Sequence, residues 1–71
     1  MEDKEVGELW RKAKLPVVIQ LIRKLVEERA RNNAVAYYHV HGPDDDAIKS
    51  CVKSALRDFG IDPTTFSDAD Q

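Results

Sequence analysis

Two histidines, His39 and His41, are the residues whose type and spacing come nearest to a chemical site. On a β-strand, residues at i and i+2 point to the same side, so both imidazoles could bind one zinc ion. The aspartates at 44–46 could then supply a third ligand. On an α-helix, residues two apart lie about 200° apart around the axis and cannot chelate one ion. We favour the helix and expect no metal site, with His39 and His41 as the alternative.

The string HVHGPDD at residues 39–45 resembles the histidine–aspartate signature of metallo-β-lactamase-type hydrolases. The likeness covers only these residues, and no histidine follows His41. A chain of 71 residues is also far too short for that fold. We therefore exclude this family.

Other patterns that support catalysis are missing from the sequence. Cys51 has the helical spacing of its apolar neighbours Ile48, Val52 and Ala55, where a free cysteine acts as a small hydrophobe. The three glycines are not clustered, so there is no glycine-rich phosphate loop. We expect a protein that is not an enzyme and that needs no cofactor.

Length and composition predict a single small domain over residues 1–71, with loose ends at about 1–3 and 68–71. A chain this short buries only ~60% of its unfolded surface, so its own core is marginal. The single cysteine excludes a disulfide within the chain and fits a reducing compartment. The charged start, MEDKEV, is not a signal peptide, and no apolar run reaches the ~20 residues of a membrane span. We expect a cytoplasmic protein without membrane contact.

Apolar residues recur at helical spacing in three stretches, which predicts an all-α, three-helix small domain with a short C-terminal helical turn. In the first helix, Asp3 is the expected N-cap and Trp10 a core anchor. The second helix starts at Pro16 and runs at least to Arg31. The aspartates at 44–46 begin the third, which carries the following apolar stripe and ends at Gly60: Ile48, Cys51, Val52, Ala55, Leu56 and Phe59. A last turn spans 64–68.

Residues 34–41 leave two interpretations open. Their valine and tyrosine favour a strand, but Ala34, Tyr37 and His41 also continue the stripe of the second helix. In the helical case, Gly42 would be the left-handed cap that ends the helix. A lone strand has unpaired edges, so the alternative is an α+β fold in which residues 34–41 pair across a dimer.

The net charge of −2 conceals a separation of charge along the chain. Residues 8–31 hold seven Lys or Arg against three Glu, giving +4, and the remainder holds four against ten Asp or Glu, giving −6. Such a bipolar chain suits self-association or docking on an anionic partner.

The second helix and the two tyrosines carry more apolar surface than one small core can cover, which indicates a protein partner. We therefore expect a regulatory protein–protein interaction module, a homodimer or an adaptor. The expected surface consists of Val17, Leu21, Leu25, Tyr37 and Tyr38, framed by Arg23, Arg29 and Arg31.

A second hypothesis is a small nucleic-acid-binding regulatory protein. Basic residues could line one side of the first two helices and contact phosphates. They are Lys14, Arg23, Lys24, Arg29 and Arg31.

Overall fold

The structure is a computed structural model that describes residues 2–39 and 41–69. Over these residues the chain forms four helices and no strand: α1 (Asp3–Lys12), α2 (Pro16–Tyr38), α3 (Asp45–Phe59) and α4 (Pro63–Ala69). The predicted all-α fold, with three main helices and a short fourth, is confirmed. None of the helices in this part of the chain is both long enough and apolar enough to cross a membrane.

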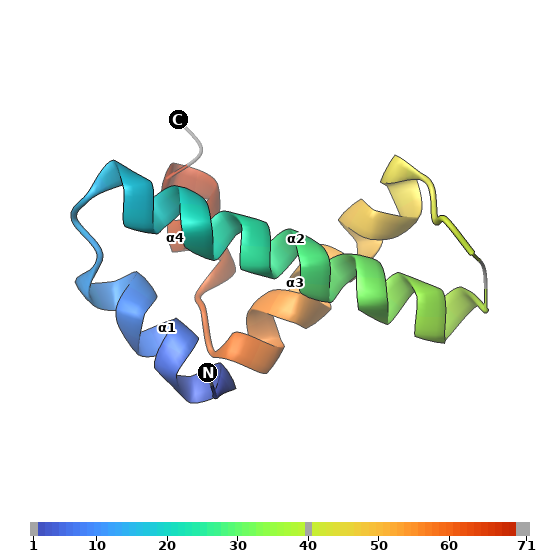
Figure 1. Cartoon of the computed structure of the whole chain (residues 1–71), viewed down its shortest axis with the longest axis horizontal. Helices are drawn as coiled ribbons and strands as arrows, with labels where there is room; N and C mark the ends of the chain where they lie inside the picture. Colours follow the sequence, from blue (N-terminus) through green and yellow to red (C-terminus); the bar gives the residue numbers. More distant parts are fainter. Residues whose placement is uncertain (1, 40, 70–71) are drawn as a thin grey trace.

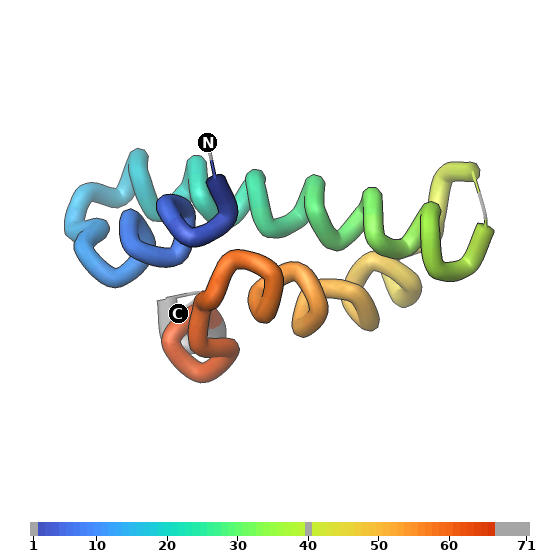
Figure 2. The backbone as a smooth tube through the Cα atoms, turned by 90° about the horizontal axis from the view of Figure 1, so that it is seen from below, coloured from blue at the N-terminus to red at the C-terminus, as the bar shows by residue number. Residues whose placement is uncertain are grey.

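The two longest helices, α2 and α3, form an antiparallel hairpin (Figures 1 and 2). α1 and α4 lie at the end of this hairpin where α2 begins and α3 ends, and α1 packs against both. At the opposite end, which we call the tip, the described chain consists of α2, α3 and the loop between them. Side chains at the tip therefore have fewer neighbours to pack against.

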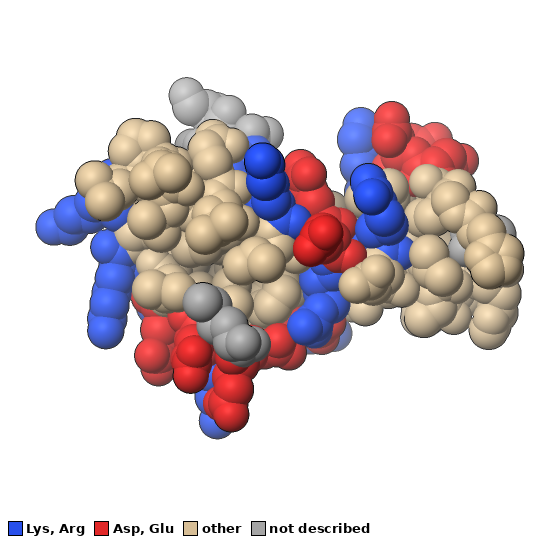
Figure 3. Space-filling model, viewed as in Figure 1, with Lys and Arg blue, Asp and Glu red and all other residues tan. Residues whose placement is uncertain are grey.

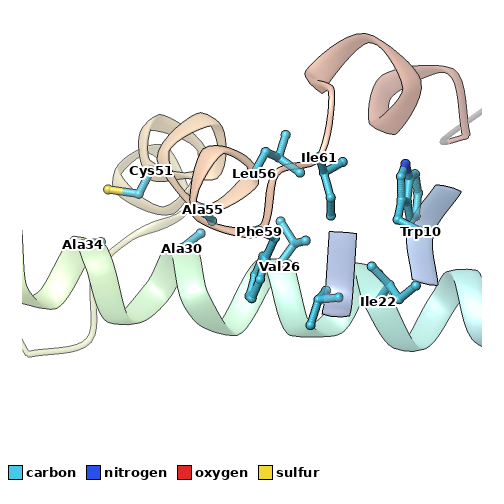
Figure 4. Close-up of a cluster of buried hydrophobic side chains, with 11 residues drawn as sticks. Trp10, Ile22, Val26, Ala30, Ala34, Cys51, Ala55, Leu56, Phe59 and Ile61 are labelled. Carbon is cyan, nitrogen blue, oxygen red and sulfur yellow. The ribbon is translucent and has the colours of Figure 1, made fainter. Parts of the chain in front are cut away.

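The core changes in character along the hairpin (Figure 4). Large side chains fill the end where α1, α2 and α3 meet: Val6, Trp10, Ile22, Val26, Leu56, Phe59 and Ile61. Toward the tip, the buried side chains are small: Ala30, Ala34, Cys51 and Ala55. Small residues let two helices pack closely without a third element between them.

Local sequence signals set both ends of α3. The Asp44 carboxylate accepts a hydrogen bond from the backbone N–H of Ala47 at 2.9 Å, which is the N-cap that the aspartates predicted. Gly60 has a φ of 72° and ends the helix as a left-handed residue. The N–H of Ile61 then donates to the Leu56 carbonyl at 2.8 Å, and the buried Ile61 side chain folds back onto the core.

The start of α1 differs from the expected N-cap. Asp3 is the first helical residue, and Glu2 takes the cap position without a side-chain hydrogen bond. Asp3 is also not part of a loose end, because its carboxylate pairs with Arg29 of α2. The Asp3 carboxylate thus links α1 to α2 in place of the predicted role as N-cap. The other residues of the expected loose ends, Met1, Asp70 and Gln71, lie outside the described residues, whereas 68 and 69 belong to α4.

The strand alternative for residues 34–41 is wrong, because α2 continues through Tyr38. Ala34 is fully buried on the side of α2 that packs against α3. This burial outweighs the local β-preference of the neighbouring valine and tyrosines, since strand preference depends strongly on context. Val40 lies outside the described residues.

The end of α2 also differs from the prediction. His39, and not Gly42, takes the left-handed cap conformation, with a φ of 53°. Gly42 also has a positive φ, 70°, but it lies in the loop. α3 starts only at Asp45. A longer α2 would therefore extend beyond the start of α3 and gain no further contacts with that helix.

Candidate interaction surfaces on α2

One side of α2 is buried and the opposite side faces outward. The buried residues recur every four positions: Ile22, Val26, Ala30 and Ala34. The residues on the side of α2 opposite the buried ones are separated alternately by four and three positions. We call them the outer stripe: Val17, Leu21, Lys24, Glu28, Arg31 and Val35. Val35 is half-buried and the other five are exposed. Figure 3 views the molecule from the side of α2 that faces away from α3 and α4.

The beginning of the outer stripe is strongly apolar. Val17 is 71% exposed, Leu21 is 59% exposed, and Leu15, just before the helix, is 62% exposed. In Figure 3, uncharged surface covers both ends of α2, while basic and acidic side chains lie side by side over its middle. The stripe therefore combines apolar ends with a charged centre.

The expected tyrosines form a separate surface at the tip. Tyr37 is 79% exposed and Tyr38 is 48% exposed, and their rings meet edge to face with centroids 5.7 Å apart. With Cys51 and neighbouring polar residues they line a hollow of about 380 Å³. At about 1.5 Å per residue, Tyr37 lies about 30 Å along the axis from Val17. The structure thus does not bring the tyrosines together with Val17 and Leu21, as the single predicted surface required.

Leu25 belongs largely to the fold. It is half-buried and packs against the core, and it lines a hollow of about 270 Å³ beside Val6 and Arg29. Its half-burial leaves part of the side chain available to a partner.

Arg29 connects three helices and does not frame an open surface. Its two terminal nitrogens donate to both carboxylate oxygens of Asp3 in α1, at 2.9 and 3.2 Å, and Nη1 also approaches Asp58 of α3 at 3.5 Å. Its guanidinium lies 4.7 Å from the ring centroid of Phe59. The hydrogen bond to Asp3 raises the pKa of Arg29, which means that the contact stabilises the charged form of the side chain.

Arg23 takes part in the attachment of α4. Its guanidinium lies 5.1 Å from the ring centroid of Phe66, and that ring lies 5.4 Å from the ring of Trp10. The Trp10 Nε1–H donates to the Thr65 hydroxyl at 3.2 Å. Trp10 is thus a core anchor, as predicted, and of the three expected framing arginines Arg31 is the exposed one.

The basic residues of the nucleic-acid hypothesis do not share one side. Lys14, Lys24 and Arg31 are exposed, whereas Arg29 is engaged between α1 and α3. Arg29 and Arg31 are two residues apart on one helix and so point about 200° apart. Nucleic-acid binding stays a prediction without support from this geometry.

His39 and His41 are both exposed and do not lie on a strand, so the arrangement that chelation required is missing. Among the described residues, no three His, Cys, Asp or Glu side chains converge as a metal site would require.

Sequence reasoning missed Lys24, Glu28 and Val35 as members of the outer stripe. The signal was present, because these residues continue the alternating 4 and 3 spacing from Val17 and Leu21. Comparisons with protein-family models, curated proteins and solved structures find no match for this chain.

Proposed function

We propose that this chain is a non-enzymatic protein-binding module and that the outer stripe of α2 is its binding surface. The observation that carries the proposal is the exposure of Val17 and Leu21, at 71% and 59%, on the side of α2 away from the core. Single exposed aliphatic residues are ordinary on protein surfaces. These two, however, are neighbours at i and i+4, and the exposed Leu15 precedes them.

The physical basis of binding would be the burial of this stripe against another apolar surface. Full burial of one valine or leucine side chain contributes about 1.5–3 kcal/mol relative to leaving it in water. A helix satisfies its backbone hydrogen bonds internally, so α2 can present side chains without any rearrangement of its backbone. The charged middle of the stripe supports the proposal further, because complementary charges favour one partner and one register over others.

Site-specific photo-crosslinking in cells tests this proposal. A photoreactive phenylalanine derivative replaces Leu21 in one variant and Lys53, an exposed residue of α3, in a matched control. We expect irradiation to give a product of defined mass from position 21 and none from position 53. The absence of a product at position 21, or the same products at both positions, would refute the proposal.

A further inference from the structure

We infer that the outer stripe binds a second copy of this chain, with the two α2 helices packed antiparallel. This inference rests on the proposed function and names the partner. The stripe positions 17, 21, 24, 28, 31 and 35 have the alternating spacing of the a and d positions in a heptad repeat. Such a repeat forms a narrow seam that drifts only about 20° around the helix every seven residues, so two helices can pack along it.

The order of residues along the seam is self-complementary in the antiparallel direction. With a two-fold axis beside the middle of α2, Lys24 of each chain faces Glu28 of the other. Both residues are exposed in the single chain, so both can reach a partner. In the same register Val17 faces Val35 of the second copy, and the apolar ends of the seam therefore meet. Leu21 lies against the aliphatic stem of Arg31, since arginine buries its carbon chain and keeps its charge in water.

A parallel pairing is disfavoured by the same residues. In parallel register each stripe position faces its own copy, which places Lys24 on Lys24, Glu28 on Glu28 and Arg31 on Arg31. Three successive layers of like charges would then fill the middle of the seam, and like charges in close contact are destabilising. The charge order therefore selects the antiparallel arrangement.

Residues beside the seam are compatible with this pairing. The half-buried Leu25 lies near the two-fold axis, where its open edge meets the same residue of the second copy. Glu27 also approaches its own copy on the other side of the seam, but Arg31 lies four residues further on and offsets that contact. α3 and α4 lie on the far side of α2, and α1 lies alongside it, so the seam is open (Figures 1 and 2).

The size of the contact predicts a weak dimer. α2 has 23 residues, and at 1.5 Å per residue it is about 35 Å long. A pair of single helices buries less than the roughly 1,200–2,000 Å² of a standard stable interface. We therefore expect a weak dimer that dissociates into single chains on dilution.

Sedimentation equilibrium between about 5 and 500 µM, a range suited to weak interfaces, tests the arrangement with wild type, K24E, E28K and K24E/E28K. We expect wild type to dimerise, each single variant to associate at least tenfold more weakly, and the double variant to recover to within about threefold. An equimolar mixture of K24E and E28K should associate more tightly than either alone, because one chain then carries two acids in the central layers and the other carries two bases. Far-UV circular dichroism of each variant verifies that the helices are intact.

The outcomes separate this inference from the proposed function. A wild-type chain that stays monomeric but crosslinks from position 21 to a different protein would overturn the dimer and leave the binding module standing. A dimer whose affinity is unchanged in both single variants would overturn the antiparallel register. A monomer without any crosslink would overturn both the dimer and the binding module.

Discussion

Replacing Gly7 with alanine should destabilise the protein, although alanine favours a helix interior by up to about 1 kcal/mol over glycine. Gly7 is buried in α1, where this helix packs against the end of α3. A Cβ atom on Gly7 would lie 2.1 Å from the carbonyl oxygen of Phe59 and 3.3 Å from its carbonyl carbon. The obstacle is backbone, so no side-chain rotation can relieve the clash.

The magnitude follows from the displacement that alanine requires. α1 must move away from α3 by at least about 1.3 Å to turn the 2.1 Å approach into an ordinary contact of 3.4 Å or more. A gap of about 0.5–1 Å already removes about a quarter to a half of the dispersion energy of each affected contact, so this displacement removes at least as much. The same displacement of α1 also loosens the packing of its buried side chains Val6 and Trp10 against the core. Overpacking of this kind costs about 1–3 kcal/mol, and after the gain in helix propensity we expect a net loss of about 1–2 kcal/mol.

Thermal and urea unfolding, followed by Trp10 fluorescence and far-UV circular dichroism, measure this loss. A destabilisation of 1–2 kcal/mol in a domain of this size lowers the melting temperature by about 5–15 °C. Glu8→Ala is the matched control, because Glu8 is exposed in the same helix, and its effect should stay within about 0.5 kcal/mol. A Gly7→Ala variant as stable as wild type, or more stable, would refute the close approach of α1 and α3.

Three further substitutions test other parts of the fold by the same unfolding measurements. Arg29→Lys should lower stability, because lysine cannot make the bidentate contact with Asp3. The expected loss is only about 0.5–1 kcal/mol, since water partly screens the ion pair. An unchanged stability would show that the contact contributes nothing. Asp44→Ala should cost about 1 kcal/mol through the lost cap to Ala47, and an unchanged melting temperature would contradict the cap. His39→Gly should raise stability by about 0.5–1 kcal/mol, because glycine adopts a positive φ without strain; a loss would argue against the left-handed cap.

The candidate surface was predictable in part. Val17 and Leu21 stand out as apolar surplus in the sequence, and the structure exposes both. The sequence could not show that α2 runs unbroken to Tyr38, and that length separates these residues from the tyrosines. The roles of Leu25 and Arg29 were also beyond reach, because each depends on where α1 lies relative to α2.

Local sequence patterns are enough to place the helices and both ends of α3. The apolar spacing of α3, the aspartate before it and the glycine after it are local signals, because a helix is built from contacts three and four residues apart. What each helix buries depends instead on how the helices pack against one another. The need for glycine at position 7 and the two partners of Arg29 come from residues distant in the chain. Such contacts depend on how whole helices fit together, and no short stretch of sequence contains that information.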